Sequence, residues 1–392
     1  SVSDLSFFEV DTVPADFDIS RGDNLNATRV GPTGFIEKGR ENLLLQSNAF
    51  TTTWTTSNSP NITSGILGYD GSLNAWEIEL TAQFGQIVQS SLSVPTISTL
   101  SIFAKAGSVG FVRLRIDATQ NAIADFDLSD GSVVYTEGNI IATKADDFGN
   151  GWFRVQMTST TASGSTVRVY PAQAANNLLA GGGSIYVQDS QLEVGLVATD
   201  VITTTSAAAT AGIKEDGPRF EYPLSGGALS LLIEPERTNL ITVSEYIGGS
   251  SWEDNSSGVT VLTNDALSPE GVKNAAKLVI DNTVSSGAQW RVATSLNPSV
   301  TNGKKYAFSV FAKAAEFDGI QIDVSNAKFG ANCNVTADLT NGSITAGSDV
   351  TSSSIEDYGN GWYRITMVGT VTGSTGVITL IFRLQVDGIN GT

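Results

Sequence analysis

The tryptophans are the side chains of this sequence best suited to binding a ligand. An exposed Trp or Tyr ring offers an apolar face on which the C–H groups of a sugar can stack. Trp54 and Trp252 each stand among Thr, Ser and Asn residues, and Trp76 and Trp290 are two further candidates. We therefore treat these four as candidate carbohydrate-binding residues. Burial in a core is the alternative for Trp54 and Trp252.

Two pairs of acidic residues could support acid–base chemistry. Residues 146–147 (Asp-Asp) and 356–357 (Glu-Asp) each precede a Gly-Asn-Gly turn. Glycoside hydrolysis uses two carboxyl groups roughly 5–10 Å apart. Asp is also common in turns, because its side chain accepts hydrogen bonds from the backbone. Since turn chemistry explains both pairs, we expect no catalytic residues and no enzymatic activity.

Metal and cofactor sites have little support in the sequence. There is no His, and the one Cys is Cys333, so triads and zinc centres that need imidazole or several thiolates are excluded. Ca²⁺ needs several oxygen ligands, but no Asp-x-Asp-x-Asp-Gly loop occurs, so any metal ligands stay unknown. We expect no cofactor, and we expect Cys333 to be an inert core residue.

The charge balance argues against two kinds of partner. Asp and Glu total 40 against 22 Lys and Arg, which gives a formal net charge of −18. Nucleic acids and anionic membranes attract cationic surfaces, so we expect neither as a partner. No apolar run approaches the roughly 20 residues of a membrane span, and the first residues lack the basic and apolar regions of a signal peptide. Hydrophobic residues make up 41% of the chain, which is enough for packed cores.

A series of short motifs occurs twice along the chain in the same order, which indicates two copies of one domain. The copies are Arg-Glu-Asn-Leu at 40–43 and Arg-Thr-Asn-Leu at 237–240, Ser-Ile-Phe-Ala-Lys-Ala at 101–106 and Ser-Val-Phe-Ala-Lys-Ala at 309–314, Asp-Leu-Ser-Asp-Gly-Ser at 127–132 and Asp-Leu-Thr-Asn-Gly-Ser at 338–343, and Phe-Gly-Asn-Gly-Trp at 148–152 and Tyr-Gly-Asn-Gly-Trp at 358–362.

The repeat also divides the tryptophans into two groups. Trp152 and Trp362 take the same place in both copies, which favours a structural role. Trp76 aligns with Lys277, and Trp290 has no Trp counterpart. Residues that differ between the copies are less suited to a shared framework, so Trp76 and Trp290 are the preferred contact residues.

The sequence pattern of both copies indicates β-structure. Residues 111–116, 152–157 and 363–368 alternate in side-chain character with a period of two, which is typical of half-buried strands. Asp-Gly and Asn-Gly between such runs favour hairpin turns. No segment keeps a helical period over three turns. We therefore predict an all-β protein of tandem antiparallel sandwiches of the jelly-roll type.

These patterns predict four segments. An attachment segment covers residues 1–39, the first sandwich 40–205, a linker with a hairpin 206–236, and the second sandwich 237–392. The first copy closes with an evident strand at residues 184–195, whereas the second copy reaches Thr392 about where that strand begins. Because a sandwich without its closing strand exposes an edge, we expect the polypeptide to continue or a neighbouring chain to supply the strand.

A family resemblance rests on motifs along nearly the whole chain. They are Phe-Asp-Ile-Ser-Arg-Gly at 17–22, Ala-Thr-Arg-Val at 27–30, Gly-Phe-Ile-Glu at 34–37, Pro-Arg-Phe-Glu-Tyr at 218–222, Leu-Ile-Glu-Pro-Glu-Arg-Thr-Asn-Leu at 232–240 and, in the first copy alone, Gln-Leu-Glu-Val-Gly at 191–195. In this order they resemble the carbohydrate-binding-module-like sandwiches of tailed-bacteriophage virion proteins in tail fibres and head fibres.

The resemblance implies a structural virion protein exposed on the particle surface, as a fibre or capsid decoration. It implies other virion proteins as partners, a homotrimer, and display of the modules for attachment to a host-surface glycan. It implies no catalysis. Two alternatives stay open, namely a subunit of a polysaccharide depolymerase and a bacterial cell-surface adhesin.

Overall fold

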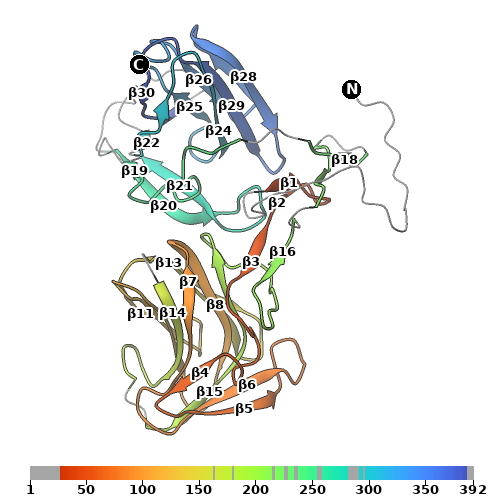
Figure 1. Ribbon diagram of the computed structural model, residues 1–392, viewed down its shortest axis with the longest axis vertical. Helices are drawn as coiled ribbons and strands as arrows, with labels where there is room; N and C mark the ends of the chain where they lie inside the picture. The colour runs from red at the N-terminus through yellow and green to blue at the C-terminus, as the bar shows by residue number, and fades with distance from the viewer. Residues whose placement is uncertain are drawn as a thin grey trace.

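The chain folds into antiparallel β-sheets. The computed structural model describes residues 27–161, 164–178, 181–213, 217–224, 228–233, 237–253, 258–280, 291–294 and 296–385. Strands form two separate sandwiches in this part of the chain, and it contains no helix (Figure 1). The predicted all-β sandwich class is therefore confirmed. None of the described residues forms a helix that could cross a membrane.

Two six-stranded sheets form the first sandwich. One of them, the β9 sheet, has the strand order β11 (Val133–Glu137), β10 (Ala122–Asp127), β9 (Phe111–Asp117), β14 (Gly164–Ala172), β7 (Gln86–Val94), β4 (Thr55–Ser57). The other, the β8 sheet, has the order β12 (Ile140–Asp147), β13 (Trp152–Thr160), β8 (Ile97–Ala106), β15 (Gly183–Val194), β6 (Ala75–Leu80), β5 (Asn61–Ile66).

The core of the first sandwich lies between these sheets. Alternate residues of β8, Leu100 and Ile102, face Leu114 and Ile116 of β9, and all four are fully buried. This period of two is the alternation seen in the sequence, because successive side chains of a strand point to opposite faces. Phe103 therefore points away from this core, onto the outer face of the β8 sheet, where it packs with Trp152.

The second sandwich repeats the strand order of the first. Its β25 sheet runs β27 (Ser343–Ala346), β26 (Asn334–Asp338), β25 (Gly319–Asp323), β31 (Ile381–Gln385), β22 (Arg291–Thr294), β19 (Trp252–Glu253), which is the order of the β9 sheet. Facing it are the β24 sheet, with β28 (Val350–Asp357), β29 (Trp362–Thr370) and β24 (Lys305–Lys313), and the pair of β20 (Val259–Ala266) and β21 (Ala275–Ile280). β23 (Ser299–Val300) pairs with β30 (Gly376–Val377).

The strand pairs that carry the repeated motifs have one register in both sandwiches. The pairs are Trp152↔Lys105 and Arg154↔Phe103 in the first, and Trp362↔Lys313 and Arg364↔Phe311 in the second. Trp152 and Trp362 thus occupy equivalent positions, as do Phe103 and Phe311. The sandwiches differ in one strand, because no described strand of the second sandwich takes the place that β15 has between β8 and β6.

Short two-stranded sheets lie between the sandwiches. β1 (Thr28–Val30) pairs with β2 (Ile36–Lys38), β3 (Arg40–Asn42) with β16 (Ala209–Ala211), and β17 (Phe220–Glu221) with β18 (Ser230–Leu231). The β1–β2 hairpin lies against the second sandwich, although it precedes the first in sequence (Figure 1). The backbone N–H of Ile36 donates to the Pro269 carbonyl at 2.8 Å, and Lys38 pairs with Glu245 and Glu270.

Asn42, at the end of β3, fixes β15 in the first sandwich. Its fully buried amide nitrogen donates to the carbonyls of Ser190 and Ile202, at 3.1 and 2.9 Å. Its oxygen accepts from the backbone N–H groups of Leu44 and Leu192, both at 3.1 Å. All four hydrogen-bonding positions of the amide are therefore used. Asn239 in the second copy is exposed and accepts from the Ile241 N–H.

We predict that Asn42→Ala lowers the free energy of unfolding of the first sandwich by about 2–4 kcal/mol. The substitution leaves several buried backbone groups unpaired, and each such group costs roughly 1–3 kcal/mol. Asn239→Ala is the matched control and should change stability by less than about 0.5 kcal/mol, as exposed substitutions do. Urea unfolding followed by Trp fluorescence measures both, and equal losses in the two variants would contradict the assigned role of Asn42.

Candidate functional site

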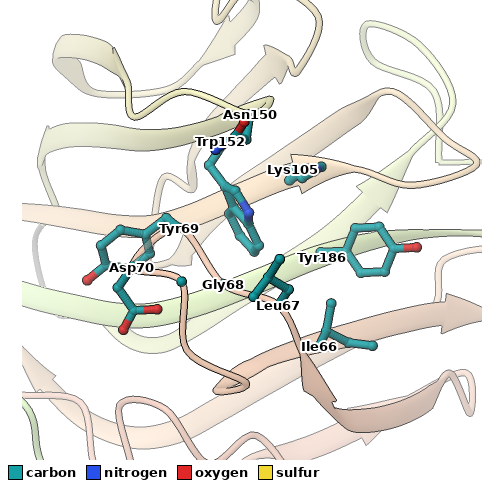
Figure 2. A pocket seen from close by; sticks show the side chains of 10 residues that line it. Ile66, Leu67, Gly68, Tyr69, Asp70, Lys105, Asn150, Trp152 and Tyr186 are labelled. Carbon is teal, nitrogen blue, oxygen red and sulfur yellow. The ribbon is translucent and has the colours of Figure 1, made fainter.

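A cavity of about 460 Å³ lies on the outer face of the β8 sheet (Figure 2). This volume is within the range of roughly 300–1,000 Å³ that is typical of small-molecule pockets. Strand ends, one turn and one loop form its walls. The lining residues are Ile66, Leu67, Gly68, Tyr69, Asp70, Gly71, Lys105, Asn150, Trp152 and Tyr186.

A row of three side chains crosses the sheet at this cavity. Lys105 of β8 is paired with Trp152 of β13 on one side and with Tyr186 of β15 on the other. Side chains directly opposite each other on neighbouring strands lie about 5 Å apart, so the three contribute one continuous surface. Trp152 is almost fully buried, whereas Lys105 and Tyr186 are half-buried. The cavity thus has an aromatic floor with an ammonium group between two rings.

Stacked aromatic rings hold the β5–β6 loop over this row. The Tyr69 ring lies parallel to Phe103, with 3.6 Å between ring centroids, and Phe148 packs edge-on against both rings. The Tyr69 hydroxyl donates to Oδ2 of Asp189 at 3.0 Å. Burial of the ring, together with the nearby Asp189 carboxylate, raises the pKa of Tyr69, so this hydroxyl keeps its proton. These contacts fix the loop and leave Leu67 exposed at the rim.

Two residues of the loop depend on its tight geometry. A Cβ atom at Gly68 would lie 1.9 Å from Oε1 of Gln188, so a larger residue at this position would require the Gln188 amide to move. Asp70 accepts hydrogen bonds from the Ser72 hydroxyl at 2.7 Å and from the Ser72 backbone N–H at 3.0 Å. The hydroxyl contact is the main reason why the pKa of Asp70 is lowered. Asp70 therefore offers a carboxylate acceptor at the cavity edge.

The Gly-Asn-Gly turn positions Asn150 and explains the second residue of each acidic pair. Gly149, Asn150 and Gly151 all have positive φ angles, of 80°, 53° and 79°, which glycine adopts without strain and Asn tolerates. Oδ1 of Asp147 accepts from the Gly149 N–H at 2.7 Å. The second turn has the same bond, from the Gly359 N–H to Oδ1 of Asp357. Both carboxylates act in turn formation, in line with the turn chemistry expected from the sequence.

The cavity combines two kinds of group that suit a sugar. Tyr186 and Leu67 present apolar surface, and Lys105, Asp70 and Asn150 supply a cation, a carboxylate and an amide. Hydroxyl groups of a saccharide can donate to Asp70 and accept from Lys105, while its C–H faces contact the rings. Among the described residues no three His, Cys, Asp or Glu side chains are placed to hold a metal ion.

Trp54 and Trp252 do not offer a ring face to solvent. Both are buried, in the cores of the first and second sandwich. The indole N–H of Trp54 donates to the Gln46 carbonyl at 3.1 Å, and that of Trp252 donates to the Val243 carbonyl at 2.9 Å. Their equivalent bonds and burial correspond to the core alternative, because a ring enclosed on both faces has no surface for a sugar.

Trp76 lies on the core side of β6, away from the cavity. It is half-buried, packs edge-on against Phe50 and donates its indole N–H to the Asn48 carbonyl at 3.0 Å. The expected alignment of Trp76 with Lys277 differs from the structure by one residue. Ala75 and Ala275 form the last pair of their ladders, and Leu278 packs on the second core as Ile78 lies in the first, which places Ala276 at the position of Trp76. Trp290, the fourth candidate, lies outside the described residues.

The sequence pattern missed the residues that line the cavity. Lys105, Asn150 and Trp152 belong to motifs that occur in both copies, and this recurrence indicated a shared framework. Leu67 and Tyr69 belong to a Leu-Gly-Tyr-Asp-Gly loop whose counterpart in the second copy reads Leu-Ser-Pro-Glu-Gly. The sequence signal that could have located the cavity is the combination of these recurring motifs with a loop whose residues differ between the copies.

The equivalent face of the second sandwich has different surroundings. Trp362 is half-buried and donates its indole N–H to the Leu267 carbonyl at 3.0 Å. The loop that corresponds to residues 66–71 accepts the backbone bond of Ile36 through Pro269. The turn of the β1–β2 hairpin lines a cavity of about 420 Å³ together with Tyr358 and Asn360. Segments of the same chain therefore meet this face.

We predict that Trp152→Ala lowers the free energy of unfolding of the first sandwich by about 3–5 kcal/mol, the usual cost of removing a buried Trp. Trp362→Ala should cost the second sandwich only about 1–2 kcal/mol, because half-exposed side chains lose less on truncation. Urea unfolding of both variants measures the losses. Equal losses would show that the two equivalent positions contribute alike to stability, against this prediction.

Comparisons with known proteins gave structural neighbours. No protein-family model and no curated protein sequence matches the chain. The enzymatically active domain of tailspike protein 4 of bacteriophage CBA120 aligns at 12% identity and a TM-score of 0.25, over 40% of this chain and 21% of its own length. This chain thus spans about a fifth of that tailspike chain.

Two neighbours are carbohydrate-binding modules. TmCBM61, in complex with β-1,4-galactotriose, aligns at 12% identity and a TM-score of 0.25, over 38% of this chain and 97% of its own. The tandem CBM51 modules of a family 98 glycoside hydrolase from Streptococcus pneumoniae align at 12% identity and a TM-score of 0.20, over 88% and 96%. At these TM-scores, only the residues of the chain itself can support a function.

Proposed function

We propose that this chain is a non-catalytic saccharide-binding protein whose site is the cavity on the outer face of the β8 sheet. The observation that supports this most directly is the row of Trp152, Lys105 and Tyr186 beneath a loop with an exposed Leu67 and a carboxylate at Asp70. Aromatic surface beside a few convergent polar groups is the usual composition of a small-molecule site.

Each chain carries one such saccharide site. In the second sandwich, the loop that corresponds to residues 66–71 is bonded to the β1–β2 hairpin, and Lys38 pairs with Glu270, the counterpart of Asp70. The carboxylate available in the first site is thus neutralised in the second. An open site of this size binds weakly, so useful attachment needs several chains, whose linkage raises avidity by roughly 10²–10⁴.

We further propose that the protein is a surface-exposed virion component of a tailed bacteriophage, in a fibre or capsid decoration, that attaches to a host-surface glycan. The support is the ordered motif series at 17–37, 218–240 and 191–195 that resembles such fibre proteins. Other virion proteins are its partners in this proposal. A depolymerase subunit and a bacterial adhesin are the competing functions.

Binding should depend on the cavity rim. We predict that Leu67→Ala and Tyr186→Ala each weaken binding to a panel of purified bacterial capsular polysaccharides and lipopolysaccharides at least tenfold, because each removes apolar surface that faces the sugar. Leu73→Ala is the matched control, since Leu73 is as exposed as Leu67 and lies on the same β5–β6 connection but does not line the cavity. Equal binding by all three variants and the parent chain would contradict the proposed site.

The protein should bind polysaccharide without cleaving it. Asp147 and Asp357 are engaged in turns, and Asp146 pairs with Lys144 at 2.7 Å, so turn formation and an ion pair account for these carboxylates. We expect no new reducing ends and no unsaturated sugars after prolonged incubation with any polysaccharide that the protein binds. Release of either product would support the depolymerase alternative.

We also predict that the protein assembles as a homotrimer in its native particle. Strand edges gain from being covered by a neighbouring chain, and the sequence resemblance implies trimers. Light scattering should give three times the chain mass of 41.0 kDa. A stable monomer at micromolar concentration would contradict the trimer and leave saccharide binding by a single chain to be measured separately.

A further inference from the structure

The hairpin of β20 and β21 joins the second sandwich to earlier segments of the chain (Figure 1). The backbone N–H of Ile36, in the β1–β2 hairpin, donates to the Pro269 carbonyl at 2.8 Å. Nδ2 of Asn264, in β20, donates to the Leu196 carbonyl of the first sandwich at 2.7 Å, and β20 also contacts β12. The β20–β21 hairpin therefore meets both the β1–β2 hairpin and the first sandwich.

Glu270, in the loop of the β20–β21 hairpin, pairs with two cations at once. Its Oε1 pairs with Nζ of Lys38 at the end of β2, and its Oε2 pairs with the guanidinium of Arg40 at the start of β3. The Glu270 side chain is 10% exposed, and each of the two cations is 17% exposed. Lys38 also pairs with Glu245. Because salt screens enclosed ion pairs less than exposed ones, this cluster is suited to hold its two sides together.

Arg40 belongs to a strand that is fixed to the first sandwich. β3 pairs with β16, and Asn42 at its end bonds the backbone of β15. The backbone N–H of Leu43 donates to the Leu192 carbonyl at 2.9 Å. The ion pair of Arg40 therefore links the second sandwich to the strand framework of the first sandwich.

The charge of the two sandwiches makes their contact depend on these cations. Residues 40–205 and residues 237–392 each contain more Asp and Glu than Lys and Arg, so the two sandwiches repel each other electrostatically. Lys38 and Arg40 place two positive charges where Glu270 would otherwise add a negative charge to the contact. Removal of these pairs would thus leave two bodies of like charge side by side.

We propose that Glu270, Lys38 and Arg40 form an electrostatic lock that holds the two sandwiches at one angle. The bonds of Ile36 and Asn264 add direction to this contact. The lock is independent of the proposed saccharide site, although it fixes the direction of that site relative to the second sandwich. A preorganised arrangement loses less conformational entropy when several chains bind one surface.

Pulsed electron paramagnetic resonance between two spin labels tests the lock on the full chain. Thr136→Cys on β11 and Ser354→Cys on β28 place the labels at exposed positions of different sandwiches, and the native Cys333 is buried. We expect one narrow distance distribution for the labelled parent chain. Glu270→Gln keeps the size of the side chain and removes its charge, and it should widen the distribution at least twofold because the shared carboxylate is lost.

Glu316→Gln is the matched control, because Glu316 pairs with Lys277 at 2.7 Å within the second sandwich and is largely exposed. It should leave the distribution unchanged. Lys38→Met is a second test that alters neither sandwich, since Lys38 lies in the β1–β2 hairpin, and it should widen the distribution as Glu270→Gln does. A broad distribution in the parent chain would overturn the proposal. A distribution that stays narrow in both test variants, or that widens equally in Glu316→Gln, would overturn it as well.

Discussion

The pairing of β15 along both of its edges is the interaction on which the first sandwich and its cavity depend, because one strand serves the core, the sheet and the site at once. Its inner residues Val187 and Leu192 are buried in the core, and Asn42 bonds its backbone. Its outer residue Tyr186 lines the cavity. Asp189 of the same strand accepts a hydrogen bond from the Tyr69 hydroxyl, which helps to fix the loop above. Burial of the Asp189 carboxyl raises its pKa. Keeping this polar group buried beside the site therefore offsets part of the free energy that stabilises the strand.

The described part of the second sandwich has the same framework with no strand in the place of β15. The register of β24 and β29 equals that of β8 and β13, and Arg364 lies over Phe311 as Arg154 lies over Phe103. The framework motifs therefore give the same local geometry in both sandwiches. What changes is the environment of the outer face, where Pro269 replaces Tyr69 and accepts a backbone bond from the β1–β2 hairpin.

Much of the fold could be predicted from the sequence, because alternation, turn residues and repeats are local signals. The strand class, the equivalence of Trp152 and Trp362 and the turn role of Asp147 and Asp357 all follow from such signals. The site could not be predicted in the same way. Its residues come from separate strands and a loop, and their meeting depends on cross-strand register. Burial of Trp54 likewise depends on Phe50 and the Gln46 carbonyl, which surround the ring in the folded chain.

The two outer faces illustrate how a duplicated sandwich can acquire two uses. Each face begins with the same row, Trp152 beside Lys105 or Trp362 beside Lys313. The β5–β6 loop crosses the first face, and the β20–β21 loop crosses the second. In the first face a tyrosine ring fixes the loop internally and leaves the cavity edge to a carboxylate. In the second face the loop bonds a hairpin and its carboxylate pairs with Lys38. A few loop residues thus direct one face toward solvent and the other toward the chain itself, while the sheet beneath stays the same.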